Sequence, residues 1–250
     1  TFYAREHFTE SIDFDKLDKH FAHTQSKLMI FSSPHNPVGR VWLREELEQL
    51  CAICEKHGVT ILSDEIHQDL VIGDHPHIPT ATLYKGRIVT LCSASKSFNL
   101  AGLKNSFVII PDEKLREQFD KFVNNICCGD GPSVGYVAAT AAFEGGLPWL
   151  NSIRDRIFDN YQAVCSEFAD RLPQAVISPL EGTYLLWIDL RKCLEPSQTK
   201  TIVQDVCGLA VDYGDWFGGE DFLGFIRINL ATSLDNVMLA VSRLLAALTE

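Results

Sequence analysis

The amino-acid sequence predicts an α/β fold built around a mostly parallel sheet. Three runs of strand length, residues 27–32, 59–62 and 87–92, are largely apolar. Continuous apolar runs are typical of strands that are buried on both faces, as in parallel sheets, whereas half-exposed strands alternate. Segments with helical periodicity alternate with these runs, and this alternation indicates a sheet that is covered by helices.

The first elements of the chain are a helix and a strand joined by a short connection. A helix is expected over residues 14–23, because Ser11 and Asp13 are residues of the types that cap helix N-termini. The strand 27–32 follows. The turn 34–39 ends it, since two prolines and a glycine break regular structure there.

The next helix is expected over residues 44–57, where Leu47, Leu50 and Cys54 recur on one face. Gly58 ends this helix as a residue of the type that adopts the left-handed conformation after a helix. The remaining elements of the first part are the strands 59–62, 87–92 and 106–110 and the helices 113–125 and 133–144.

The second part of the chain alternates less regularly, which is typical of an α+β unit. Its expected elements are the helices 147–172, 199–208 and 237–249 and the strands 176–178, 183–190 and 225–229. We therefore expect two domains: residues 1–146, part of a larger α/β domain with a mostly parallel sheet, and residues 147–250, a smaller C-terminal α+β domain.

The composition is that of an ordinary globular protein, with 46% hydrophobic and 22% charged residues. The net charge is -11 and no Lys/Arg-rich run is present, which disfavours nucleic acids and anionic membranes as partners. No stretch reaches the roughly 20 apolar residues of a membrane span. Residues 1–20 lack the apolar core of a signal peptide. We expect a cytoplasmic location.

The eight cysteines do not form a metal-binding pattern. Cys51 and Cys54 are spaced as C-x2-C, but they lie in the helix expected over residues 44–57, and no second pair completes a zinc site. We expect reduced cysteines that are mostly buried as small hydrophobic residues, and no bound metal.

Three polar side chains stand at or just beyond the ends of predicted strands. Asn36 follows the strand 27–32, Asp64 follows 59–62, and Lys96 follows 87–92. In parallel α/β sheets, ligands bind beyond the carboxyl ends of the strands. A lysine in such a position can form an imine with an aldehyde when its amine is deprotonated. The sequence therefore predicts a site that combines these three residues.

Five motifs in this order resemble the aminotransferase class I/II family of enzymes of fold type I, which use pyridoxal 5′-phosphate (PLP), and more narrowly its cystathionine β-lyase (C–S lyase) branch. The motifs are residues 33–42, 63–70, 93–103, 181–184 and 225–229, which read SPHNPVGRVW, SDEIHQDL, SASKSFNLAGL, EGTY and FIRIN. The resemblance extends from Lys27 to the end of the chain, and it implies the large PLP-binding domain and small domain of that fold.

The resemblance implies a role for four residues at the reacting centre. Lys96 is expected to form the Schiff base with PLP and then to act as the general base. Asp64 is expected to pair with the pyridine nitrogen of PLP, and Asn36 to donate to its phenolate oxygen. Arg227 is expected to bind the substrate carboxylate, because a guanidinium can do so through two hydrogen bonds. Capping, turn or surface roles are the alternatives for these residues.

Four further residues are implied in cofactor binding. Ser93 and Ser95 are expected near the PLP phosphate, or else as helix caps. His67 stands where many aminotransferases have tyrosine and is expected near the phenolate, with a structural histidine as the alternative. Lys104 stands where many relatives have a phosphate-binding arginine and is expected near the phosphate. Its ammonium cannot donate the two parallel hydrogen bonds of a guanidinium.

The resemblance implies a PLP-dependent lyase that eliminates a thiol from a sulfur-containing amino acid, releasing pyruvate and ammonia. An aminotransferase using the same groups is one alternative, and a catalytically silent fragment is another. Only 35 residues precede Asn36, and none resembles the glycine-rich phosphate-binding turn that the family carries upstream. We expect a chain that lacks the N-terminal portion of the family and, by the same resemblance, a homodimer.

Overall fold

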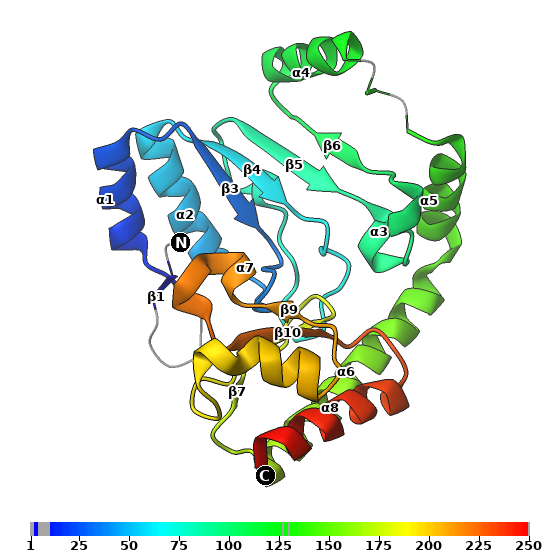
Figure 1. Ribbon diagram of the computed structural model, residues 1–250. Helices are drawn as coiled ribbons and strands as arrows, with labels where there is room; N and C mark the ends of the chain where they lie inside the picture. The colour runs from blue at the N-terminus through cyan, green and yellow to red at the C-terminus, as the bar shows by residue number, and fades with distance from the viewer. Residues whose placement is uncertain (1–2, 5–10, 127, 130, 250) are drawn as a thin grey trace.

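A four-stranded sheet of strand order β3-β4-β5-β6 forms the first half of the molecule (Figure 1). The computed structural model describes residues 3–4, 11–126, 128–129 and 131–249. The strands are β3 (Leu28–Ser32), β4 (Thr60–Asp64), β5 (Ile88–Cys92) and β6 (Phe107–Ile109). The pairs β3–β4 and β4–β5 are parallel, whereas β6 is antiparallel to β5. The predicted mostly parallel sheet is confirmed, but the expected burial of its strands on both faces is wrong for β3, where Leu28 is 56% and Ile30 72% exposed.

Two helices cover this sheet beside β3. They are α1 (Phe14–Thr24) and α2 (Arg44–His57), and their apolar side chains share a core with β3, β4 and β5. Asp13 caps α1 by accepting from the Lys16 N–H at 2.9 Å. Gly58 ends α2 with φ 63°, in the left-handed region that glycine adopts without strain. Both predicted helix boundaries are therefore confirmed at the caps.

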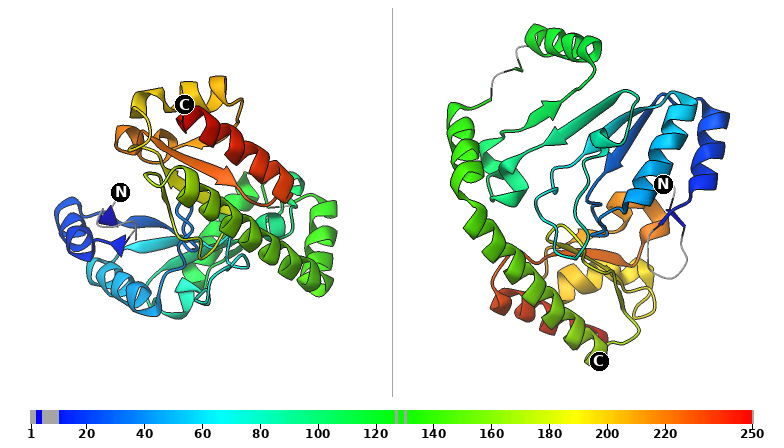
Figure 2. Two further views of the ribbon diagram at one scale, coloured as in Figure 1. Left: turned by 90° about the horizontal axis from the view of Figure 1, so that it is seen from below. Right: turned by 180° about the vertical axis from the view of Figure 1, so that it is seen from behind.

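Four further helices follow, of which the first lies between β5 and β6 and the other three come after β6. They are α3 (Ala94–Ser97), α4 (Glu113–Asn125), α5 (Ser133–Gly145) and α6 (Leu147–Arg171). Figure 2 shows α5 and α6 running one after the other from the edge of the first sheet to the second half of the molecule. The helices α4 and α5 carry many exposed hydrophobic side chains, among them Phe122, Val134, Tyr136 and Val137.

A second, antiparallel sheet of order β7-β8-β10-β9 forms the other half. Its strands are β7 (Val176–Ile177), β8 (Leu185–Asp189), β9 (Asp212–Tyr213) and β10 (Phe225–Asn229). The helices α6 and α8 (Leu234–Thr249) pack together and share a core with β8 and β10. The C-terminal α+β unit is thus present as predicted.

Several elements differ from the sequence prediction. The predicted strand 183–190 is shorter because Thr183 turns with φ 69° and its hydroxyl accepts from the Leu185 N–H at 3.0 Å. The predicted helix 199–208 contains a π-helix over Thr201–Val206. The strand β9 and the one-turn helix α7 (Asp215–Gly218) were not predicted, since elements this short have no periodicity.

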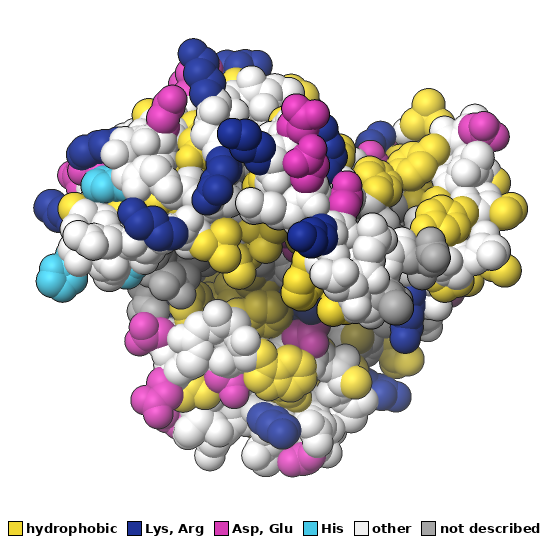
Figure 3. Space-filling model, turned by 90° about the horizontal axis from the view of Figure 1, so that it is seen from above, with side chains coloured by type: hydrophobic (Ala, Val, Ile, Leu, Met, Phe, Trp, Pro, Cys, Tyr) yellow, Lys and Arg dark blue, Asp and Glu magenta, His cyan; other side chains and the backbone are white. Residues whose placement is uncertain are grey.

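The remaining elements are short. They are the strands β1 (Tyr3–Ala4) and β2 (Ser11–Ile12) and the 3₁₀ turns η1 (Thr80–Thr82), η2 (Ala101–Leu103), η3 (Pro196–Gln198) and η5 (Gly219–Phe222). Within the described ranges, no helix combines the length and apolar character needed to cross a bilayer. Figure 3 shows one face of the molecule, hollowed near its centre with hydrophobic side chains on the floor of the hollow.

The cysteines that the structure describes are free thiols, as predicted. Cys51, Cys54, Cys92 and Cys207 are buried, whereas Cys128 is exposed. Burial raises the pKa of Cys51 to about 11 and that of Cys54 to about 12, so both stay protonated and unreactive at neutral pH. In the described part of the chain, no three His, Cys, Asp or Glu side chains are grouped so as to hold a metal ion.

Candidate active site

The three polar residues predicted at strand ends lie at one edge of the first sheet. Asp64 is the last residue of β4, Asn36 lies in the turn after β3, and Lys96 lies in α3, which begins two residues after β5. The carboxyl ends of these strands face the second sheet, where β9 and β10 lie (Figure 1). The parallel register delivers all three side chains to this edge because parallel strands end on the same side.

Arg227 joins the two halves of the molecule at this edge. It extends from β10, and its Nη1 donates to Oδ1 of Asn36 at 2.5 Å, across 191 positions of sequence. Its Nε donates to Oδ2 of Asp212 at 3.1 Å, and its Nη2 also contacts that oxygen. The guanidinium carbon lies 4.8 Å from the ring centre of Phe217. These contacts hold the guanidinium beside Asn36.

Sequence reasoning missed Asp212 and Phe217. Asp212 pairs with Arg227 across β9 and β10, and this register is the signal that identifies it. The pairing was not visible from the sequence because β9 has only two residues. Phe217 belongs to α7, which likewise has no sequence periodicity.

His67 lies in the turn after β4, where Lys96 and Arg227 both act on it electrostatically. It is 3% exposed and packs edge-on against Tyr184, with 5.6 Å between ring centres. Burial, followed by the charges of Lys96 and Arg227, lowers the pKa of His67 to about 4. His67 is therefore neutral at neutral pH, and its Nδ1 has no hydrogen-bond partner among the described residues.

The short helix that carries Lys96 is held at both ends of its single turn. The Ser93 hydroxyl accepts from the Ser95 N–H at 2.9 Å and donates to the Asn105 carbonyl at 2.6 Å. The Ser97 hydroxyl donates to Asp69 at 2.8 Å, which ties α3 to the turn after β4. Ser93 thus acts as the N-cap of α3, which is the alternative role that the sequence left open for it.

The other predicted site residues have fewer contacts. Ser95 and Lys96 are half-buried. Lys104 ends η2 with φ 49° and is exposed. Among the described residues, no hydrogen bond or ion pair connects the Lys104 side chain to the strand ends, and its role in binding phosphate stays a prediction.

Hydrogen-bonding capacity remains on the groups that PLP would require. Nζ of Lys96 makes no hydrogen bond or ion pair within the described part of the chain. The Asp64 carboxylate accepts one hydrogen bond, from the Ile66 N–H at 3.2 Å, through Oδ1. Asn36 uses its Oδ1 for Arg227 and keeps its Nδ2 as a donor. An amine, a carboxylate and an amide donor at one sheet edge fit an aldehyde, a pyridine nitrogen and a phenolate oxygen.

The fold and this site define a protein of the PLP-dependent aminotransferase type. The chain belongs to the aminotransferase class I and II family, whose model matches residues 2–244. It is 33% identical to protein MalY of Escherichia coli strain K12 and 33% identical to cystathionine beta-lyase PatB of Bacillus subtilis strain 168. These alignments cover 94% and 96% of this chain but 61% and 62% of the relatives, so the chain spans less than two thirds of their length.

Solved structures show the same similarity. The PLP-bound C–S lyase from Staphylococcus hominis aligns with TM-score 0.92 and 32% identity, over 99% of this chain and 64% of that one. Cystalysin from Treponema denticola, whose structure contains PLP, aligns with TM-score 0.90 and 31% identity, over 98% and 63%. The fold is therefore that of fold type I PLP enzymes, as the sequence motifs predicted.

Proposed function

We propose that this chain is part of a PLP-dependent C–S lyase that acts on a sulfur-containing amino acid such as cystathionine or a cysteine S-conjugate. One observation carries the proposal: Asn36, Asp64 and Lys96 share one sheet edge, and Arg227 reaches that edge from the second sheet. The names of the similar proteins support elimination over amino transfer, since they include cystathionine beta-lyase and C-S lyase.

Each residue has a chemical task in this proposal. When bound, PLP supplies an aldehyde that takes up an amine and a pyridinium ring that accepts the electrons of the substrate Cα–H bond. Lys96 tethers the cofactor and then removes the Cα proton. Asp64 keeps the ring nitrogen protonated through its negative charge. Asn36 donates to the phenolate oxygen, and Arg227 binds the substrate α-carboxylate.

Removal of the Cα proton allows the bond between Cβ and sulfur to break. The sulfur leaves as a thiol, and hydrolysis of the remaining fragment yields pyruvate and ammonia. Neutral His67 contributes a ring that can donate or accept a hydrogen bond without adding charge beside the phenolate. Ser95 and Lys104 bind the phosphate, and Ser93 supports that binding by capping α3, the helix that carries Ser95.

The first test is covalent labelling of Lys96. The purified chain is incubated with PLP, reduced with borohydride and digested. A phosphopyridoxyl mass is expected on the peptide that contains Lys96. Lys96→Ala should lose the label, whereas Lys85→Ala, which changes an exposed lysine, should keep it. A folded wild-type chain without the label contradicts the proposal and favours the silent-fragment alternative.

The second test separates elimination from amino transfer. Protein that has been incubated with PLP but not reduced is given cystathionine without a keto acid, and thiol and pyruvate are measured. Their release supports the lyase, whereas turnover only with a keto-acid acceptor shows an aminotransferase.

We also propose a cytoplasmic homodimer without nucleic-acid or membrane partners. The net charge of -11 argues against those partners, and the exposed hydrophobic side chains of α5 support a dimer. Light scattering during size-exclusion chromatography measures the molecular mass, which distinguishes a dimer from a monomer.

A further inference from the structure

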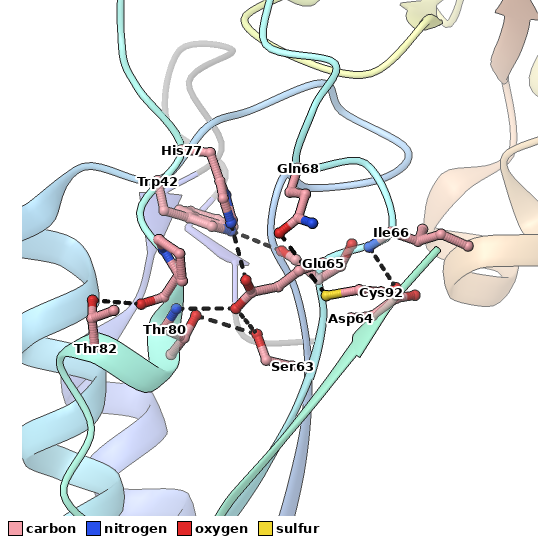
Figure 4. Close-up of polar contacts among 12 residues, drawn as sticks. Trp42, Ser63, Asp64, Glu65, Ile66, Gln68, His77, Thr80, Thr82 and Cys92 are labelled. Carbon is pink, nitrogen blue, oxygen red and sulfur yellow. Dashed lines mark hydrogen bonds and ion pairs between the residues drawn. The ribbon is translucent and has the colours of Figure 1, made fainter. Parts of the chain in front are cut away.

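A fully buried carboxylate follows directly after Asp64. Glu65 is 0% exposed, and each of its oxygens accepts a hydrogen bond. Oε1 accepts from the Ser63 hydroxyl at 2.8 Å and from the Thr80 N–H at 3.0 Å. Oε2 lies 3.0 Å from Nε2 of His77. Figure 4 shows His77, Thr80 and Ser63 converging on Glu65.

Glu65 is ionised within this cluster. Burial alone would raise its pKa, but the hydrogen bonds from His77, Ser63 and the Thr80 N–H together hold the pKa of Glu65 below its ordinary value. Because the carboxylate carries no proton, the hydrogen between it and His77 belongs to the imidazole. A buried carboxylate is tolerated only while such donors are kept in place, so the cluster fixes these segments to one another.

The cluster lies on the opposite side of the backbone from the Asp64 side chain. Side chains alternate along a strand, and Ser63 and Glu65 are both buried while Asp64 between them is half-buried. The main chain here is held in the sheet, since the Ser33 N–H donates to the Asp64 carbonyl and the Glu65 N–H to the Leu91 carbonyl, both at 3.0 Å. In Figure 4, Glu65 extends toward His77, and Asp64 lies on the other side of the chain.

The Asp64 side chain makes few interactions that would fix its orientation. Within the described residues, its one hydrogen bond is the 3.2 Å contact from the Ile66 N–H, two residues along the same turn. Its direction is therefore set by the backbone of residues 63–66. That backbone is anchored from behind by the two flanking side chains, Ser63 and Glu65.

We propose that Glu65 is a positioning residue that, held by Ser63, His77 and Thr80, fixes the end of β4 so that the Asp64 carboxylate faces the cofactor. The role of Asp64 as the partner of the pyridine nitrogen rests on the proposed function. The anchoring of the strand end by Glu65 does not require the cofactor and can be measured without it.

The first experiment measures amide hydrogen exchange in the chain without PLP. Glu65→Ala removes the acceptor of three hydrogen bonds, so protection at Glu65 and Ile66 should fall at least about tenfold. Glu65→Gln keeps an acceptor for Ser63 and Thr80 and should therefore retain most of the wild-type protection at residues 65 and 66. Should Glu65→Ala fail to fold, Ser63→Ala and His77→Ala each remove one partner and should lower the same protection by a smaller factor.

The matched control is Tyr84→Phe. The Tyr84 hydroxyl donates to the Val59 carbonyl next to the opposite end of β4, and Tyr84 is 6% exposed. This variant also loses a buried hydrogen bond, beside the other end of the same strand, yet its loss of protection should be confined to residues near Val59. Unchanged protection at Glu65 and Ile66 in folded Glu65 or His77 variants overturns the proposal.

The second experiment reads the ring nitrogen directly. PLP carrying ¹⁵N in the ring is bound, and the ¹⁵N chemical shift distinguishes pyridinium from pyridine. At mildly alkaline pH, Glu65→Ala should move the signal toward the neutral pyridine, Glu65→Gln should move it less, and Tyr84→Phe should leave it unchanged. A shift that stays at the wild-type value in Glu65→Ala overturns the positioning role.

The two proposals fail in different ways. A wild-type chain that takes up no PLP contradicts the proposed function, and the loss of protection in the Glu65 variants still supports the anchoring. A wild-type chain that binds PLP while the Glu65 variants keep normal exchange supports the proposed function and contradicts the anchoring.

Discussion

His67 shows how one residue acquires its properties from two distant parts of the chain. Its ring is buried against Tyr184, which precedes β8, and its charge state responds to Lys96 and to Arg227. Burial removes water that would stabilise the charged imidazolium, and the two cations disfavour it further. The site therefore contains a neutral imidazole near two basic side chains.

A pH dependence of stability follows from this histidine. The pKa of His67 falls from an ordinary value of 6.5 to about 4 in the folded state, so between these values the unfolded chain binds more protons. The free energy of unfolding should therefore decrease as the pH falls from 6.5 toward 4. At pH 5, His67 should account for a loss on the order of 2 kcal/mol relative to pH 7.

The measurement is urea unfolding at pH 7 and pH 5. His67→Asn should lose less free energy of unfolding between these pH values than the wild type does. His23→Asn changes an exposed histidine in the last turn of α1 and should behave as the wild type does. Equal pH dependence in His67→Asn and the wild type would contradict the neutral, buried state of this ring.

At the scale of elements, caps decide where the helices end. Gly58 follows α2 with φ 63°, and its N–H bonds to the carbonyl oxygens of Cys54 and Glu55. Gly145 ends α5 without positive φ. A Cβ at either glycine would meet nothing within 4 Å, so the two positions differ in backbone conformation and not in space.

This pair gives a controlled test of the cap. Gly58→Ala should destabilise the protein by about 1 kcal/mol and lower Tm by about 2–4 °C, because alanine is strained in the left-handed region. Gly145→Ala should leave Tm unchanged or raise it slightly, since alanine favours a helix over glycine. Thermal unfolding monitored by circular dichroism compares the two. Equal effects would show that the strain at Gly58 is relieved elsewhere.

At the scale of the whole molecule, the segment 181–183 lies between loops of the first half. The N–H groups of Glu181 and Gly182 donate to the Gly39 carbonyl at 2.9 and 2.8 Å, and the Thr183 N–H donates to the Leu70 carbonyl at 2.8 Å. Leu70 itself lies in the core of the second half. The two halves are therefore joined by main-chain bonds as well as by Arg227. The predicted division at residues 146 and 147 stays a prediction about domains.

Gly182 is the point where this junction has least space. A Cβ there would lie 2.9 Å from Cγ2 of Val41 and 3.1 Å from Cβ of Pro34. Gly182→Ala should therefore destabilise the protein by about 1–3 kcal/mol. It should also weaken PLP labelling of Lys96, because the loop it displaces carries Asn36.

The control is Gly102→Ala, where a Cβ would meet nothing within 4 Å. Both variants are compared by denaturant unfolding and by the yield of the borohydride label. A Gly182→Ala protein with wild-type stability and label yield would show that the junction adapts to a methyl group without moving the site.

The sequence by itself determined the order along the chain of the longer strands and helices and the positions of Asn36, Asp64 and Lys96 at strand ends. Apolar runs, caps and turns are local patterns, and parallel strands that share a direction must present these ends at one edge. The motifs around these residues also identified the family. Local patterning sufficed for the first sheet because its strands are apolar runs of strand length and its longer helices have their own periodicity.

Only the tertiary structure decided how the second half completes the site. Asp212 and Phe217 hold Arg227 through a two-residue strand and a one-turn helix, and Glu65 becomes an anchor only when Thr80 and His77 fold onto it. Such roles depend on contacts between residues far apart in the chain. Burial of His67 also requires both halves, because the groups that keep it neutral come from β10, from α3 and from the packing around Tyr184.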